Sequence, residues 1–128
     1  MRNIIIKSVK NYVSTYLNED ILPSEKFNLE KCKCIKIGIK EKEKQFFMNL
    51  KISLHSLEHI CNTLFGFSSE DMYDDVGKEM LNVIAGNILL QKGGEYDLQI
   101  PQICNSCKTE KGIFFRNKNI QFTISISK

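Results

Sequence analysis

The sequence predicts an α+β fold in which helices pack against an antiparallel sheet. Two kinds of apolar pattern occur along the chain: spacings of three or four residues, typical of amphipathic helices, and spacings of two, typical of strands. They follow one another in the order α-β-β-α-α-β-β-β, without the regular strand–helix alternation of parallel sheets. The chain has 128 residues, 42% of them hydrophobic, which is enough for one core. We therefore expect a single domain over residues 1–128.

The first third of the chain is predicted to form a helix and a hairpin. Residues 3–18 carry apolar side chains on one helical face, at Ile6, Val9, Val13 and Leu17. Alternating apolar residues then mark two strands, over residues 34–40 and 46–54. The charged run 40–44 between them indicates a solvated turn, so we expect the two strands to pair antiparallel.

Two helices are predicted in the middle of the chain. Helical spacing begins at residue 55 or 56 and continues to Gly66, a residue type that commonly ends helices. Ser68 or Ser69 is expected to cap the next helix, because acidic residues follow and favour a helix N-terminus. That helix should run to about Gln91, before a pair of glycines.

Three more strands are predicted after the third helix. They cover residues 96–104, 112–116 and 120–126. The last segment alternates apolar and hydroxyl side chains, as a strand with one buried face does. These strands would complete the sheet on which the helices lie.

Composition excludes several classes of protein. The net charge is only +3 and the two signs are interspersed, which argues against nucleic acid as the ligand. No apolar run approaches the roughly 18 residues that span a bilayer, and the N-terminal residues lack the pattern of a secretory signal. We therefore expect a cytoplasmic protein that binds neither nucleic acid nor a membrane.

A polar stripe on the third predicted helix is the main candidate for a functional site. At about 100° per residue, Glu79, Asn82 and Gly86 all fall within roughly 40° of Asp75 on the helical wheel. Apolar residues at positions 76, 80, 83, 84 and 88 occupy the other side, so the stripe should face outward. A glycine inside a helix costs about 1 kcal/mol relative to alanine, which indicates a close approach to the backbone at Gly86. Most polar stripes are only solvated surface, so the pattern needs further support.

That support comes from a resemblance. The helix is similar to the signature of the CheC/CheX/FliY chemotaxis phosphatases, in the spacing Asp75-x-x-x-Glu79-x-x-Asn82-x-x-x-Gly86 and the continuation Asn82-Val83-Ile84-Ala85-Gly86-Asn87. The later segment Leu98-Gln99-Ile100-Pro101 resembles the proline-ended strand of CheX. A single copy of the motif resembles CheX more than CheC or FliY, which usually carry two. The chain departs from the family in its upstream strands, rich in Lys, Ile and Phe instead of glycine, and at Gln102, where threonine is common.

The resemblance implies a phosphatase that hydrolyses the aspartyl phosphate of a CheY-like receiver protein. A carboxamide suits the positioning of the attacking water, because it accepts and donates hydrogen bonds without adding charge beside phosphate, and Asn82 is the candidate. Glu79 would dock on the receiver's lysine, and Asp75 and Gly86 would support partner binding. The receiver would carry the Mg²⁺, so no cofactor of the chain's own is expected, and a homodimer is implied. The alternative is a non-catalytic CheX-like adaptor that binds a receiver domain or a motor component without turnover.

A second motif points to different chemistry. Residues 55–59 spell H-x-x-E-H, which in inverted zinc metallopeptidases supplies two zinc ligands and a catalytic glutamate. Here His55 falls at a strand–helix junction and no third-ligand motif follows. We therefore expect the two histidines to be surface residues at a helix start.

The five cysteines occur in a chain without a secretory signal, so reduced thiols are expected. Two pairs, Cys32-x-Cys34 and Cys104-x-x-Cys107, could supply four thiolates to a structural zinc ion if the fold brought them together. The spacing alone does not decide this, and the sequence prediction is a chain without a metal site.

Overall fold

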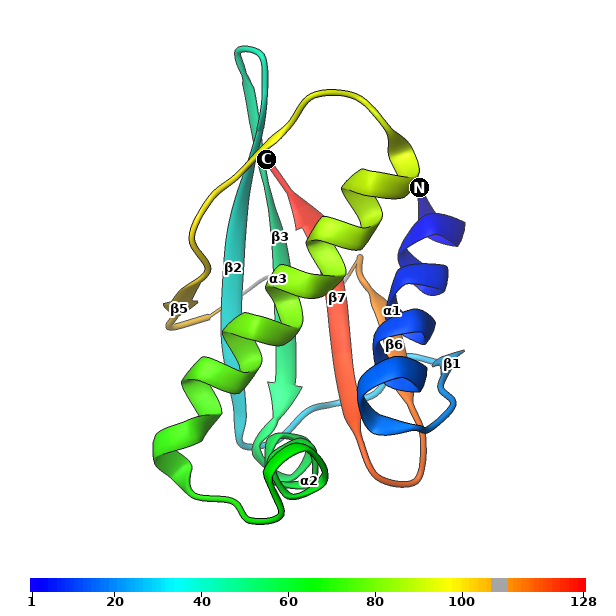
Figure 1. Ribbon diagram of the computed structural model, residues 1–128, viewed down its shortest axis with the longest axis vertical. Helices are drawn as coiled ribbons and strands as arrows, with labels where there is room; N and C mark the ends of the chain where they lie inside the picture. Colours follow the sequence, from blue (N-terminus) through cyan, green and yellow to red (C-terminus); the bar gives the residue numbers. More distant parts are fainter. Residues whose placement is uncertain (107–110) are drawn as a thin grey trace.

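The helices lie on one face of an antiparallel sheet (Figure 1). A computed structural model describes residues 1–106 and 111–128. In the view of Figure 1, α1 (Arg2–Leu17) and α3 (Tyr73–Lys92) run along the front of the sheet, and α2 (Leu54–Phe65) lies near its lower end. The predicted α+β class, with helices packed against an antiparallel sheet, is confirmed.

The sheet is built from seven strands within the described residues. In chain order these are β1 (Leu22–Ser24), β2 (Cys32–Glu41), β3 (Lys44–Ser53), β4 (Asp97–Leu98), β5 (Gln102–Cys104), β6 (Ile113–Arg116) and β7 (Gln121–Ser127). Their spatial order is β1-β6-β7-β3-β2-β4, and β5 also pairs with β2. The short strands β4 and β5 therefore form one edge, next to the strand on which α3 packs.

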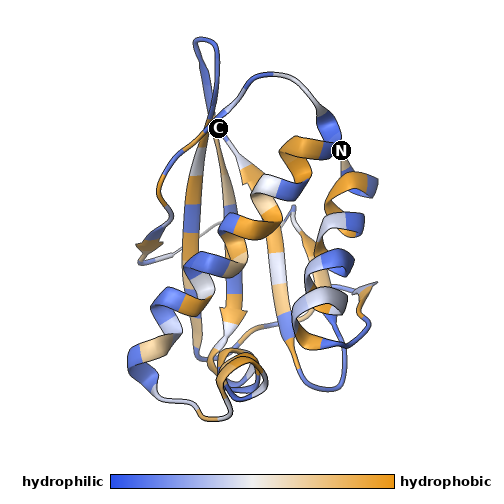
Figure 2. Ribbon diagram, in the orientation of Figure 1, coloured by the Kyte–Doolittle hydropathy of each residue, from blue (hydrophilic) through white to orange (hydrophobic). Residues whose placement is uncertain are grey.

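Strands β2 and β3 form the predicted hairpin. They pair antiparallel from Cys32 opposite Ser53 to Glu41 opposite Lys44. The turn between them places Lys42 at φ 56°, and Figure 2 shows a continuous hydrophilic tip there, as the charged run indicates. This end of the hairpin projects beyond the neighbouring strands in Figure 1.

The core lies between the helices and the inner face of the sheet. Every second residue of β2 and β3 is fully buried there: Ile35, Ile37, Ile39, Met48, Leu50 and Ile52. Val9 and Val13 of α1 are equally inaccessible to solvent. Burying each such side chain stabilises the fold by about 1.5–3 kcal/mol before entropy is counted. The strand periodicity thus fixes which face receives the helices.

Several element boundaries match the sequence prediction. Helix α2 begins at Leu54, where the side-chain oxygen of Ser53 accepts a hydrogen bond from the Ser56 amide at 3.1 Å. It ends at Gly66, which adopts φ 82°, a conformation that glycine reaches without strain. Helix α3 ends at Lys92, one residue beyond the expected position.

Other boundaries differ from the prediction for identifiable reasons. Strand β1 was not predicted, because it has only three residues and contains Pro23, which cannot donate a backbone hydrogen bond. The predicted strand 96–104 is broken into β4 and β5 by a segment that includes Pro101. The predicted serine cap of α3 is wrong: Ser69 precedes a 3₁₀ turn, η1 (Glu70–Met72), and α3 starts at Tyr73 without a side-chain cap.

Candidate functional site

A groove runs beside α3, between its polar stripe and the segment that joins β4 to β5. Its volume is about 520 Å³. Its lining residues are Asp75, Lys78, Glu79 and Asn82 from α3, and Leu98, Gln99, Ile100 and Pro101 from the facing segment. Three of the residues predicted from sequence, Asp75, Glu79 and Asn82, therefore share one groove.

The orientation of α3 follows from its opposite face. Six residues of that face are buried in the core: Val76, Met80, Leu81, Ile84, Ala85 and Ile88. Val83, which was expected on the apolar side, is only half-buried. Close to the start of the helix, the ammonium of Lys33 on β2 lies 2.8 Å from the carboxylate of Asp74. The core and this ion pair together hold the polar stripe toward the groove.

A glycine lets α3 approach the sheet closely. A methyl group on Gly77 would lie 2.4 Å from the Cδ1 atom of Ile35 on β2. A larger residue would therefore force Ile35 to repack or the helix to move outward. The distance between this part of α3 and β2 therefore depends on Gly77.

The facing wall of the groove is fixed to β2 through Gln99. The Gln99 amide donates a hydrogen bond of 2.9 Å to the Gly38 carbonyl, and the Gln99 side-chain oxygen accepts one of 2.9 Å from Gln45. A Cβ atom on Gly38 would lie only 1.9 Å from that side-chain oxygen. Gly38 therefore leaves room for the Gln99 side chain to pass over β2 toward Gln45 on β3, and the next residue, Ile100, lines the groove with 83% of its surface exposed.

The groove combines acidic, basic and neutral polar groups. Asp75 and Glu79 are exposed, whereas Lys78 and Asn82 are half-buried. No described residue forms an ion pair with Lys78. Tyr12 on α1 has a raised pKa. Burial is the largest cause, and electrostatic repulsion from Tyr16 and from Glu79 adds to it, so this phenol stays neutral at physiological pH. A carboxylate, an ammonium and a carboxamide are thus available to bind a polar ligand and position a water molecule.

Gly86 lies outside this groove. It is half-buried, it is not a lining residue, and a methyl group added there would meet no described atom within 4 Å other than those of its own helix backbone. The close approach expected at Gly86 is therefore not made by another part of the described chain. The surface beside it is open to a partner.

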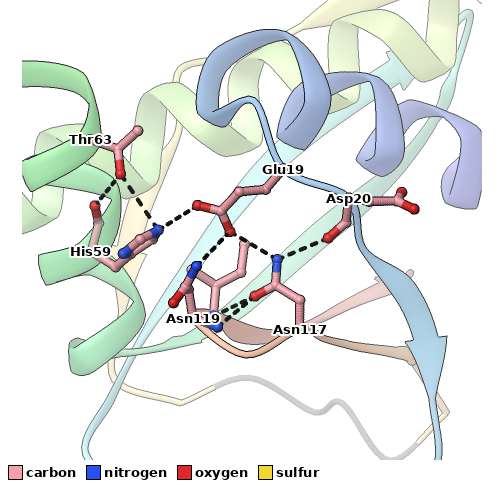
Figure 3. Close-up of polar contacts among 7 residues, drawn as sticks. Glu19, Asp20, His59, Thr63, Asn117 and Asn119 are labelled. Atoms are coloured by element: carbon pink, nitrogen blue, oxygen red, sulfur yellow. Dashed lines mark hydrogen bonds and ion pairs between the residues drawn. The ribbon is translucent and has the colours of Figure 1, made fainter.

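The H-x-x-E-H segment forms a different kind of contact. His59 on α2 lies 2.6 Å from the Glu19 carboxylate, which also accepts hydrogen bonds from Asn117 and Asn119 (Figure 3). The remaining members of the motif, His55 and Glu58, are exposed. His59 thus connects α2 to the residues after α1 and to the β6–β7 turn, and is not the surface residue that the sequence predicted.

The cysteines do not define a metal centre in the described part of the chain. Cys34 on β2 lies opposite Cys104 on β5, and Cys107 is outside the described residues. Burial raises the pKa of the Cys32 thiol, although the nearby Lys51 opposes this shift. Among the described residues, no group of three or more His, Cys, Asp or Glu side chains could hold a metal ion.

The sequence prediction missed one helical residue and the function of one loop. Lys78 lines the groove, and its position about 40° from Asn82 on the helical wheel could have identified it. The sequence predicts residues 98–101 as part of a strand that ends in proline, but not as a wall of the groove. Only the tertiary contact of Gln99 with Gly38 reveals that role.

Comparison with solved structures identifies the fold. The chain has the α+β fold of the CheX and CheC-like chemotaxis proteins, which it matches over nearly its whole length. The chemotaxis protein CheX from Vibrio vulnificus matches with a TM-score of 0.82 and 15% identity, over 98% of this chain and 93% of that one. A CheC-like superfamily protein from Shewanella sp. PV-4 matches with a TM-score of 0.77 and 19% identity, over 98% and 95%. The Borrelia burgdorferi CheX–CheY–BeF₃–Mg²⁺ complex matches with a TM-score of 0.63 and 16% identity, over 99% and 97%.

The similarity to these proteins is found by comparing structures and not by comparing sequences. No protein-family profile matches the chain, and no curated protein matches it in sequence. Within the described residues, no helix has the length and apolar character that crossing a membrane requires.

Proposed function

We propose that the protein is a CheX-type phosphatase that hydrolyses the aspartyl phosphate of a CheY-like receiver. The observation that carries the proposal is that Glu79 and Asn82 line one groove on a helix whose opposite face is held in the core. The CheX fold and the Glu-x-x-Asn spacing support the same conclusion independently.

Asn82 is assigned the role of positioning the attacking water molecule. Hydrolysis requires a nucleophile in line with the breaking bond, and a carboxamide can hold water without repelling the phosphoryl group. Asn82 is half-buried and so has less freedom than an exposed side chain. This favours a fixed water position once the receiver is bound.

Glu79 is assigned the role of docking on the receiver. A carboxylate near a phosphoryl group and acidic metal ligands is repelled unless it meets a cation, and in the proposed complex the receiver's lysine is that cation. Exposed Glu79 is free to form such a pair. Asp75 and Gly86 lie before and after the catalytic pair on the same stripe and would contact the receiver around it.

The Mg²⁺ in this proposal belongs to the receiver. The Borrelia burgdorferi complex contains CheX, CheY, BeF₃ and Mg²⁺ together. Removing Mg²⁺ should therefore act through the receiver and not through folding of this chain. Circular dichroism of the isolated protein with and without EDTA should be the same.

The decisive experiment measures decay of a phosphorylated CheY-like receiver with purified wild-type protein. Asn82→Ala should bind a BeF₃-activated receiver normally but accelerate decay about 10²-fold less than wild type, because the water is no longer positioned. Glu79→Ala should weaken both binding and acceleration, since it removes the docking contact.

Matched controls are available on α2. Asn62→Ala and Glu58→Ala make the same chemical changes at exposed positions outside the groove, and both should leave the decay unchanged. If wild type accelerates decay but Asn82→Ala does so equally well, the assignment of Asn82 is wrong. If wild type binds the activated receiver without accelerating decay, the chain is the adaptor that the sequence leaves as the alternative.

The proposal includes the homodimer implied by the CheX resemblance. Light scattering coupled to size exclusion would measure a mass of twice 14.8 kDa for such a dimer. A monomeric mass at the concentrations used in the phosphatase assay would remove the dimer from the mechanism.

A further inference from the structure

The outer face of the sheet, away from the helices, carries a second hollow. The chain between β1 and β2 crosses this face, and the ring of Phe27 packs edge-on against Phe114 of β6 at 5.1 Å between centroids. The hollow has a volume of about 300 Å³. It is lined by Lys26, Phe27, Asn28, Leu29, Lys51, Phe114 and Thr123. None of these residues lines the groove beside α3.

A buried hydroxyl group lies at this hollow. Thr123 of β7 is fully buried, and its side-chain oxygen has no hydrogen-bond partner among the described residues. Its neighbours across the strands are Lys51 on one side and Phe114 on the other. Native proteins rarely leave a buried hydroxyl unpaired, so a missing partner points to a water or a ligand.

The charged residues that line the hollow in the described part of the chain have one sign. Among residues 1–106 and 111–128, two lysines and no acidic residue line it, and neither lysine has an ion-pair partner there. Asn28 adds an amide that can donate hydrogen bonds. An anion in the hollow would pair with both ammonium groups and accept a hydrogen bond from the Thr123 hydroxyl.

The remaining walls are apolar. Phe27, Leu29 and Phe114 contribute rings and an alkyl chain beside the polar donors. A volume of this size exceeds what a single phosphate or carboxylate group fills. The lining therefore suits an anionic group attached to an apolar body.

We propose that this hollow binds a small organic anion, a phosphate or carboxylate with an aromatic or aliphatic group. Lys26, Lys51, Asn28 and Thr123 would hold the anionic group, and Phe27, Leu29 and Phe114 would cover the apolar part. The site is on the opposite face of the sheet from the groove and does not depend on the proposed phosphatase function.

The test is a titration of the full chain with phenyl phosphate and, separately, benzoate, followed by amide chemical shifts in NMR. We expect saturable shifts at Lys51, Phe114 and Thr123 with either or both probes.

Thr123→Val and Lys51→Met should each weaken binding roughly tenfold, as the loss of one hydrogen bond to a charged group does. Lys36→Met is the matched control, because Lys36 of β2 also lies on the outer face of the sheet, with its ammonium over the Phe47 ring, but does not line the hollow.

Thr123→Val also separates binding from folding. Valine has nearly the shape of threonine and removes the unpaired hydroxyl, so the free variant should be at least as stable as wild type. Saturable shifts that weaken in both hollow variants but not in Lys36→Met would establish the site. Equal affinities in all variants, or no saturable shift up to about 10 mM of either probe, would overturn it.

Discussion

A single glycine determines how closely the groove wall approaches β2. In Gly38→Ala the new methyl group would overlap the Gln99 side chain, which must swing away and lose its hydrogen bond to Gln45. Gln99 is exposed and flexible, so we expect the free energy of unfolding to fall by only about 1 kcal/mol. Ile100 should move with it, so affinity for an activated receiver should fall clearly more than stability does. Urea unfolding and receiver titration measure the two effects, and unchanged receiver affinity would show that the wall is not a contact surface.

At Gly86 we expect a glycine-to-alanine substitution to raise stability while it weakens receiver binding. Outside its own helix backbone, the added methyl group of Gly86→Ala meets no described atom within 4 Å, and alanine favours a helix by up to about 1 kcal/mol over glycine. We therefore expect the variant to be more stable in thermal unfolding but a weaker partner for the receiver, because the methyl group occupies the space of the approaching surface. A variant that gains stability and binds the receiver as wild type does would remove Gly86 from the interface.

Among the elements, periodicity predicted those that are long and amphipathic. Helix α3 keeps one apolar face over 20 residues, so its position and the direction of Asn82 follow from the pattern alone. Strand β1 and the break between β4 and β5 could not be predicted in this way, because edge strands of two or three residues carry too few alternating positions. The groove wall was missed for a different reason: it depends on the hydrogen bond between Gln99 and Gly38, a contact between residues far apart in the sequence.

The Glu19–His59 contact joins three elements and should make their packing sensitive to acid. Burial alone would raise the pKa of Glu19, but the hydrogen bonds from His59, Asn119 and Asn117 and the His59 charge lower it below its usual value near 4.5. A lowered carboxylate pKa stabilises the fold at pH values above the unfolded-state pKa, and that stability is lost as the pH falls through the folded-state pKa. Glu19→Gln should therefore be less stable than wild type at pH 7 and lose less stability between about pH 5 and pH 3.

Urea unfolding at a series of pH values measures this difference. Glu25→Gln is the matched control, because Glu25 is exposed and its carboxylate forms no ion pair with a described residue. Parallel pH profiles for wild type and Glu19→Gln would show that the contact does not link folding to protonation.

At the scale of the whole molecule, the sheet separates two candidate sites. The groove lies on the helix side, bounded by α3 and the β4–β5 edge, whereas the hollow lies on the outer face over β3, β7 and β6. The fully buried residues Leu50 of β3 and Ile124 of β7 belong to the core on the helix side of the sheet. Substitutions that are distant and share no contacts usually have additive effects. We therefore expect Lys51→Met to leave receiver dephosphorylation unchanged and Asn82→Ala to leave phenyl phosphate affinity unchanged.

The double variant should show both single losses, each within about a factor of two. A larger loss in either assay would mean that the sheet transmits a change from one face to the other, because no described residue lines both sites.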